Sequence, residues 1–288
     1  MNDIKHHTVQ INGISFHVAE KGEGPLALML HGFPECWYSW RFQIDALAAA
    51  GFRAVAPDLR GYGQTDAPPT GYDLRTLVAD VRALAAELGE ERPHIIGHDW
   101  GGLIAWSYAQ SHPDALATLT VMDAPHPRAI ASPKGLLNPR QLARSWYIFW
   151  FQVPYFPERK IVRHARGYAK AAIRGTATRK ENFTDADMAV YAELLSANVS
   201  QKLAYYRQLF RQFPTVARDA RRPITAPTLV LWGENDPFVG AHFTRGLDAL
   251  GVCNLRGAHV IPNAAHWLQQ EAPDEVNGYL VEHLTRRC

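Results

Sequence analysis

The spacing of apolar and polar residues predicts strands that alternate with helices over the first 122 residues. Short runs that predict buried strands lie at residues 26–30, 52–57, 93–96 and 117–122. Apolar residues at helical spacing predict helices at residues 37–50, 74–88 and 103–112. Residues 26–30 are continuously apolar, which is typical of a parallel strand covered on both faces. The alternation predicts a doubly wound, mainly parallel sheet.

The alternation is preceded by a hairpin and interrupted once. Residues 9–19 alternate around Asn12-Gly13, which predicts a two-stranded hairpin at a sheet edge. Between residues 127 and 222 we recognise no buried strand and expect helices at residues 139–152, 157–174, 186–196 and 203–217. The alternation resumes with a strand at 228–232, a helix reaching Leu250, a strand near 259–261 and a last helix ending near Thr285.

We therefore predict an α/β core in two parts and an inserted helical domain. The core comprises residues 1–126 and 223–288, and residues 127–222, here called the cap segment, form the insertion. An insertion between the strands of such a sheet is expected to cover their carboxyl ends, where open α/β sheets hold their ligands. It would exclude water from whatever site lies there.

A tight turn is predicted at residues 97–102, which read Gly-His-Asp-Trp-Gly-Gly. The residues before it predict a strand, and the apolar residues after it recur at helical spacing. Small residues on both sides of one polar residue let the backbone pass close to itself, which is the arrangement of a nucleophile elbow. We therefore expect Asp99 to be held up at the carboxyl end of the sheet.

An aspartate at such a turn predicts a particular chemistry. Serine in this position attacks acyl carbon, whereas a carboxylate is better suited to displacement at a polarised sp³ carbon, which leaves an alkyl-enzyme ester. The alternative is that Asp99 only caps the helix that follows it. Hydrolysis of an ester requires a base and a residue that orients the base, so we expect the rest of the chain to supply both.

Two residues in loops at the carboxyl edge fit these roles. Asp236 follows a predicted strand in the run Gly-Glu-Asn-Asp-Pro, and His266 follows the last strand in the run Asn-Ala-Ala-His-Trp. Taken alone, they have structural explanations as a helix cap and a loop histidine. Together they give the chain order nucleophile, acid, histidine of α/β-hydrolases. Asp123 is an alternative orienting acid because it also ends a strand at this edge, but the motif context favours Asp236.

Several motifs carry a resemblance to a known family. They are His-Gly-Phe-Pro-Glu at residues 31–35, Trp-Tyr-Ser-Trp-Arg at 37–41, the turn at 97–102 and His-Trp at 266–267. Together they strongly resemble the epoxide hydrolases of the α/β-hydrolase fold, over nearly the whole chain and most specifically in the core. The resemblance implies that Asp99 is the nucleophile, His266 the base and Asp236 its partner. It also implies an oxyanion hole formed by the backbone N–H groups of Phe33 and Trp100.

The same resemblance implies two tyrosines in the cap that hold the epoxide oxygen, and Tyr147 and Tyr206 match them. Phenols suit this task because a pKa near ~10 keeps them protonated at neutral pH. Tyr155 and Tyr205 are the alternatives, since the cap segment is aromatic throughout. Ile148 stands where some relatives have a glutamine, so polar help from that position is missing.

The remaining site residues are predicted from aromatic side chains near these motifs. The predicted substrate-binding residues are Trp100, Trp146, Phe149, Trp150, Phe151 and Trp267. Such a lining predicts a neutral, hydrophobic epoxide as the substrate, with water as the second reactant. We assign His31 and Glu35 to shaping the oxyanion loop. We expect neither a metal nor an organic cofactor, because the reaction needs none.

Two other functions are kept as alternatives. A haloalkane or haloacid dehalogenase uses the same aspartate attack, but relatives that act on haloalkanes usually have asparagine at the position of Phe33. Those that act on fluoroacetate have arginine at the position of Trp100, so both departures favour the epoxide. A non-catalytic ligand receptor would keep the pocket without turnover. The presence of Asp99, Asp236 and His266 argues against it.

Composition and charge add limits on partners. The 288 residues are 47% hydrophobic, which is sufficient for a packed interior. Thirty basic and twenty-eight acidic residues give a net charge of +2, so no overall field would recruit nucleic acid or an anionic membrane. We interpret the basic residues at 159, 160, 163 and 166 as a solvated helix face. No run approaches the ~18 apolar residues of a membrane span.

The cysteines and the N-terminal residues bear on location. Cys36, Cys253 and Cys288 have neither a disulfide pattern nor metal-ligand spacing, which fits a reducing cytosol. The first residues lack the apolar stretch of a signal peptide. We therefore expect a cytoplasmic protein that acts as a monomer or a homodimer.

Overall fold

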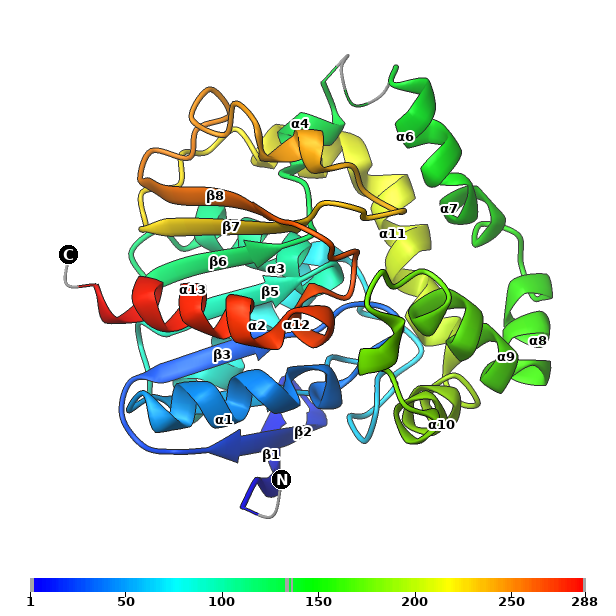
Figure 1. The fold of residues 1–288 in the computed structure, drawn as a ribbon, viewed down its shortest axis with the longest axis horizontal. Helices are drawn as coiled ribbons and strands as arrows, with labels where there is room; N and C mark the ends of the chain where they lie inside the picture. Colours follow the sequence, from blue (N-terminus) through cyan, green and yellow to red (C-terminus); the bar gives the residue numbers. More distant parts are fainter. Residues whose placement is uncertain (1–2, 133–134, 136, 287–288) are drawn as a thin grey trace.

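A computed structural model of the chain describes residues 3–132, 135 and 137–286 (Figure 1). Its centre is an eight-stranded sheet with the strand order β1-β2-β4-β3-β5-β6-β7-β8. Pairing is antiparallel between β1 and β2 and between β2 and β4, and parallel between all the other neighbours. The strands are β1 Lys5–Ile11, β2 Ile14–Lys21, β3 Leu26–Leu30, β4 Arg53–Pro57, β5 His94–His98, β6 Thr118–Met122, β7 Thr228–Gly233 and β8 Leu255–Ile261.

These pairings confirm the predicted mainly parallel sheet and its edge hairpin. Asn12 and Gly13, which join β1 to β2, both have positive φ angles of 50° and 75°. A two-residue loop with two positive φ angles matches the right-handed twist of the strands that it connects. The hairpin therefore follows directly from the local sequence.

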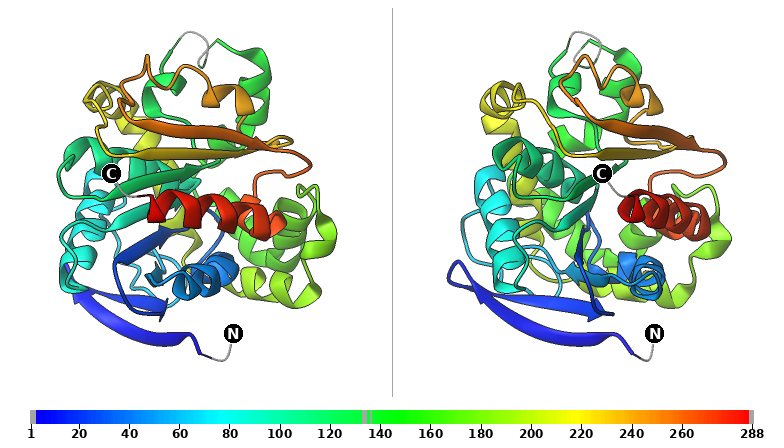
Figure 2. Two further views of the ribbon diagram at one scale, coloured as in Figure 1. Left: turned by 60° about the vertical axis from the view of Figure 1, so that its left-hand side comes forward. Right: turned by 90° about the vertical axis from the view of Figure 1, so that its left-hand side faces the viewer.

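Helices cover both faces of the sheet (Figure 2). One face is covered by α1 and α13, whose buried residues pack with Met29, Ala54 and Ile96. The other is covered by α2 and α3, whose buried residues pack with Leu28, Val55 and Ile95. The flanking elements are η1 Trp37–Trp40, α1 Arg41–Ala49, α2 Leu74–Glu87, α3 Trp100–Ser111, α12 Leu268–Glu271 and α13 Pro273–Thr285. The sheet is thus the middle of three layers.

Between β6 and β7 the described residues form helices and no strand. Figure 1 shows α6 to α11 gathered at the end of the sheet where β3 terminates. The elements are α4 Pro127–Ile130, α6 Pro139–Arg144, α7 Trp146–Trp150, α8 Phe156–Arg163, α9 Ala165–Ala169, η2 Lys170–Arg174, η3 Lys180–Asn182, α10 Asp185–Leu194 and α11 Val199–Asp219. The domain boundaries at residues 126 and 222 stay a prediction.

Two of the predicted cap helices are divided into shorter ones. The helix expected at 139–152 is interrupted at Ser145, where α6 ends and α7 begins. The helix expected at 157–174 is interrupted at His164, whose φ of −124° and ψ of 30° lie outside the helical range. Apolar spacing alone does not detect such breaks, because the apolar residues keep their period across them.

The helix predicted to reach Leu250 is wrong. In this part of the chain the structure has only the short helix η4, Ala241–Thr244, followed by turns. Gly246 has a φ of 70°, a conformation that glycine adopts readily and that ends a right-handed helix. The last strand consequently starts at Leu255, earlier than expected. None of the described helices is long and apolar enough to cross a membrane.

Candidate active site

The predicted turn around Asp99 is present between β5 and α3. Asp99 has a φ of 50° and a ψ of −114°, and its side chain makes no capping hydrogen bond to α3. A β-carbon on Gly97 would lie 2.2 Å from the carbonyl oxygen of Gly101, and one on Gly101 would lie 2.0 Å from that of Leu30. Only glycine fits these two positions. The strained backbone directs the Asp99 side chain away from the helix that it was alternatively expected to cap.

The Asp99 carboxylate lies between a backbone donor and an imidazole. Its Oδ1 accepts a hydrogen bond of 2.9 Å from the N–H of Phe33, and its Oδ2 lies 3.6 Å from Nε2 of His266. Burial acts to raise the pKa of Asp99, but the hydrogen bond and charge of His266 outweigh it and lower this pKa. Asp99 is therefore ionised at neutral pH, as a nucleophile must be.

His266 is oriented by Asp236. Nδ1 of His266 donates to Oδ2 of Asp236 over 2.8 Å, and Oδ1 of Asp236 accepts from the N–H groups of Phe238 and Val239 at 2.7 and 2.9 Å. Burial acts to lower the pKa of His266, but the carboxylates of Asp236 and Asp99 raise it well above its usual value. Asp236 is therefore the hydrogen-bond partner of His266, as predicted. The two carboxylates favour the protonated form of the imidazole.

The loop that carries Phe33 is supported by buried polar groups. The N–H of Leu59 donates to Nε2 of His31 over 2.9 Å, and the N–H of Gly32 donates to Oε2 of Glu35 over 3.2 Å. The same Glu35 oxygen lies 2.8 Å from Nδ1 of His98, and Nε2 of His98 lies 2.7 Å from the carbonyl oxygen of His266. Both His31 and Glu35 therefore hold this loop, and Glu35 also connects it to the histidine loop.

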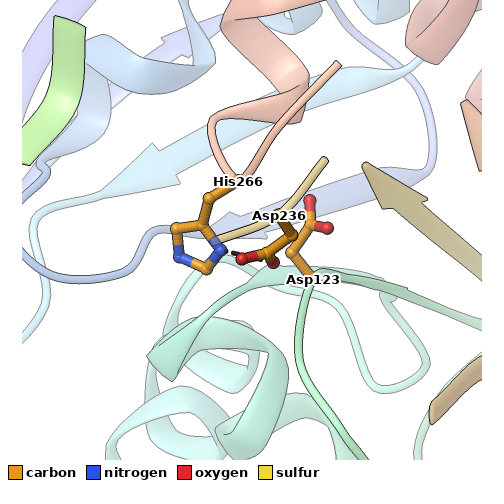
Figure 3. A group of neighbouring side chains, drawn as sticks. All are labelled: Asp123, Asp236 and His266. Carbon is orange, nitrogen blue, oxygen red and sulfur yellow. Dashed lines mark hydrogen bonds and ion pairs between the residues drawn. The ribbon is translucent and has the colours of Figure 1, made fainter. Parts of the chain in front are cut away.

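Asp123, the alternative orienting acid, lies on the side of Asp236 that faces away from His266 (Figure 3). It is fully buried after β6, and its Oδ1 accepts a hydrogen bond of 2.8 Å from the N–H of Gly233. One ligand atom from each of Asp123, Asp236 and His266 lies within 4.8 Å of the other two, a spacing that a metal ion could also use. Burial and the neighbouring Asp236 raise the pKa of Asp123 well above its usual value. The raised pKa favours the neutral form of Asp123, which lies next to the acid that holds His266.

Replacement of Asp123 by asparagine is expected to stabilise the protein increasingly as the pH rises. A raised pKa in the folded state means that folding takes up a proton, so wild-type stability falls as the pH rises above the unfolded pKa of ~3.9. Asparagine has the same shape and no such dependence. The difference in free energy of unfolding should grow by up to about 1.4 kcal/mol per pH unit. Urea unfolding at about pH 5 and about pH 8 measures it, and parallel pH profiles of the two proteins would contradict the assignment.

The two predicted tyrosines meet above Asp99. The rings of Tyr147, from α7, and Tyr206, from α11, have centroids 6.0 Å apart. Burial raises the pKa of each hydroxyl well above its usual value, and Asp99 raises both further. Tyr205 is less suited, because its hydroxyl donates to the carbonyl oxygen of Arg60 over 2.8 Å. Tyr155 is 75% exposed and lies outside the site.

Two cavities meet at these residues. Both are lined by Asp99, Tyr147 and Tyr206. The first cavity, of about 310 Å³, is otherwise largely apolar, with Trp100, Leu103, Ile148, Leu209, Phe210 and Phe243 in its lining. The second cavity, of about 230 Å³, contains His266 and the side chains of Phe33, Trp146, Trp150, Phe151, Phe238 and Trp267. A molecule that contacts Asp99 can therefore extend in two directions.

The cavities include all the predicted binding residues except Phe149. Its side chain is 53% exposed, and its ring packs against Phe210 with centroids 6.1 Å apart. The short helix α7 places Tyr147 inward, and Phe149, two residues later, falls on its outer side. We therefore remove Phe149 from the pocket. Phe238, which the sequence analysis missed, lies in the second cavity, 5.0 Å from the ring of His266.

Glu271 was also missed, although it is fully buried and connects the cap segment to the histidine loop. Its Oε2 accepts from the N–H groups of Thr178 and Arg179 at 2.7 and 3.0 Å. Its Oε1 accepts from those of Ala265 and Trp267, on either side of His266, at 3.2 and 3.3 Å. The only available signal was a run of polar residues, Gln-Gln-Glu, after an apolar loop.

Comparison with known proteins agrees with this geometry. The profile of the alpha/beta hydrolase fold family matches residues 25–273. "Epoxide hydrolase 3" of Xenopus tropicalis is 39% identical over 95% of this chain and 75% of its own length. "Epoxide hydrolase A" of Mycobacterium tuberculosis is 34% identical over 96% of each chain. The crystal structure of epoxide hydrolase VrEH1 from Vigna radiata is 32% identical, with a TM-score of 0.87 over 98% of each chain.

The fold and these matches define the chain as an α/β-hydrolase. Within that class it belongs to the epoxide hydrolase family, whose members are hydrolases.

Proposed function

We propose that the protein hydrolyses an apolar epoxide to a vicinal diol through an ester with Asp99. The observation that carries this proposal is the position of one ionised carboxylate. It is 2.9 Å from the N–H of Phe33 and 3.6 Å from His266, in cavities lined by two tyrosines. A serine-type acyl transfer lacks its nucleophile here, because the turn carries an aspartate.

In the first step, Asp99 attacks one carbon of the epoxide while Tyr147 and Tyr206 donate hydrogen bonds to the ring oxygen. The C–O bond of the ring breaks as the bond to the carboxylate forms, and the oxygen takes a proton from a phenol. The raised pKa of both tyrosines keeps them protonated before the reaction. Developing alkoxide charge, rather than ground-state acidity, draws the proton across.

In the second step, His266 removes a proton from water, which attacks the carboxyl carbon of Asp99. Ester formation removes the negative charge of Asp99, one of the two carboxylates that raise the pKa of His266. The imidazole therefore loses its proton more readily in the ester than in the free enzyme, and the phenolate left by ring opening takes that proton. Neutral His266 is then the base for the water. Backbone N–H groups of Phe33 and Trp100 stabilise the oxyanion. As the ester C–O bond breaks, the departing oxygen takes the proton that His266 removed from water, so the diol leaves with an oxygen from Asp99. The regenerated carboxyl group of Asp99 then returns a proton to His266.

The two cavities support an epoxide substituted on both carbons. Since Asp99, Tyr147 and Tyr206 line both of them, a ring held by these residues would direct one substituent into each cavity. The linings are mainly aromatic and aliphatic, so neutral apolar substituents fit. No metal or organic cofactor takes part in the proposed reaction.

Replacement of Tyr147 or Tyr206 by phenylalanine is expected to slow ring opening. Each single variant should lose about tenfold in the rate of ester formation and the double variant about 10³-fold, because the leaving oxygen then lacks its proton donors. Rapid-mixing kinetics under single-turnover conditions measure this rate. Tyr155→Phe is the matched control and should stay within about twofold of wild type, since a residue outside the site takes no part. Unchanged rates in both single variants would contradict the assignment.

An assay of products separates the proposal from its alternatives. The purified protein is incubated with disubstituted apolar epoxides and, in parallel, with haloalkanes and haloacids of matched length. Diol formation without halide release is the expected result. Halide release would identify a dehalogenase that uses the same Asp99. Binding of these compounds without any turnover would favour the alternative that the protein is a non-catalytic ligand receptor.

A further inference from the structure

The small net charge of the chain conceals a strong separation of charge. The cap segment contains eighteen basic and six acidic residues, a net charge of +12, whereas the rest of the chain has a net charge of −10. Such asymmetry between parts of a protein is a feature of proteins that bind polyanions or anionic surfaces. The expectation that no electrostatic field recruits an anionic partner therefore holds for the net charge of the whole chain but not for the cap segment.

Six of these basic residues are exposed in one stretch of the cap segment, whose exposed residues we call the outer cap face. It consists of the exposed residues of α6, α7, α8, their connections and the first residues of α9, within residues 137–167. Its basic residues are Arg140, Arg144, Arg159, Lys160, Arg163 and Arg166, all of them exposed. None of these six forms an ion pair with a residue that the structure describes. The only acid in this stretch, Glu158, is paired with Arg207 over 2.7 Å.

The same face exposes large apolar side chains. They include Leu142, Trp146, Phe149, Tyr155, Phe156 and Val162, with exposed fractions between 45% and 75%. Phe149 packs on the 51% exposed Phe210 of α11, and Trp146 packs on Trp150 with ring centroids 6.2 Å apart. Figure 1 shows α6, α7 and α8 on the side of the molecule farthest from the sheet. Clustered exposed apolar residues of this kind mark an interaction surface.

The outer cap face borders both cavities of the active site. Trp146, which is 63% exposed, lines the second cavity, and Phe149 of this face packs on Phe210 of α11, which lines the first. Nζ of Lys160 lies 6.0 Å from the ring centroid of Trp150, which also lines the second cavity. A basic group therefore lies beside an aromatic residue of the second cavity.

We propose that the outer cap face docks on the surface of an anionic lipid bilayer, from which apolar molecules reach the cavities. Tryptophan and tyrosine favour the membrane–water interface, and each basic residue near an anionic bilayer adds to binding. A second copy of the chain fits less well, because a symmetric contact would bring two strongly positive faces together. A nucleic acid would leave Leu142 and Val162 without an apolar partner.

Vesicle sedimentation tests the proposal with the full-length protein. Wild type should bind vesicles in which one third of the phosphatidylcholine is replaced by phosphatidylglycerol, bind pure phosphatidylcholine at least tenfold more weakly, and dissociate at high salt. Arg159→Glu/Arg163→Glu should weaken binding at least tenfold, because two attractive charges become repulsive. Tyr155→Asn/Phe156→Ser should weaken it at least threefold by removing interfacial anchors.

The matched control is Lys5→Glu/Arg256→Glu, which changes the net charge equally on the two edge strands of the sheet. This variant should bind within twofold of wild type. All variants should turn over a water-miscible epoxide at the wild-type rate without vesicles, so a failure of the proposed reaction is distinguished from a failure of docking. Equal vesicle binding by wild type and Arg159→Glu/Arg163→Glu would overturn the proposal. So would a dimer that dissociates in the Tyr155/Phe156 variant, or retention of a DNA duplex without vesicle binding.

Discussion

Replacement of Asp99 by alanine is expected to abolish diol formation, with a loss of at least about 10⁴-fold in kcat. In the proposed reaction the substitution removes the atom that forms the bond to carbon, and neither of the two acids next to His266 is placed to replace it. The raised pKa of Asp123 favours its neutral form, and Asp236 is occupied by His266 and two backbone N–H groups. Steady-state turnover of a disubstituted epoxide measures the effect.

An isotope experiment on the wild-type protein tests the same step from the opposite side. With excess enzyme in ¹⁸O-water, the first diol formed should contain only unlabelled oxygen, because its new oxygen comes from Asp99. The label should then appear in the Asp99 carboxylate and only later in the diol. Asp123→Asn is the matched control and should retain turnover. Label in the first diol, or activity in Asp99→Ala, would contradict the covalent route.

Replacement of His266 by glutamine is expected to stop the reaction at the ester. Ring opening needs Asp99 and the two tyrosines, whereas hydrolysis of the ester needs a base, so only the second step should slow, by about 10³-fold. Asp99 also loses the cation that lowers its pKa, which should move the acid limb of ester formation to higher pH. Intact-protein mass spectrometry should detect the covalent adduct after mixing with substrate.

The control for this variant is His242→Gln, which changes an exposed histidine that lines neither cavity. It should accumulate no adduct and turn over at the wild-type rate. If no covalent adduct formed on the His266→Gln protein at any time, His266 would be needed for the first step. Rapid release of diol from it would assign the base to another residue.

The parts that were predicted correctly depend on local pattern. Apolar runs and glycine spacing around Asp99 determine the strand, the turn and the start of α3 within a few residues. The pairing of Asp236 with His266 could be predicted because parallel strands bring their carboxyl-end loops to one edge. The breaks at Ser145 and His164, and the turn at Gly246, were missed because apolar periodicity continues through them.

Features that depend on distant segments could not be predicted in the same way. Glu271 contacts the cap segment across more than ninety residues of chain. No local sequence pattern predicts such a contact. The orientation of Phe149 depends on how α7 packs on α11. The charge separation is present in the sequence, but the net charge of +2 averages over the two parts of the chain and does not reveal it.

The buried carboxylate of Glu271 has a consequence for exchanging parts among relatives. It satisfies N–H groups at residues 178 and 179 with one oxygen, and those flanking His266 with the other. A transplanted helical insertion that places its backbone differently there would leave an acceptor without donors and release the loop that holds His266. Chimeric proteins built to alter substrate preference should therefore keep the junction around residue 178 together with the host's C-terminal loop.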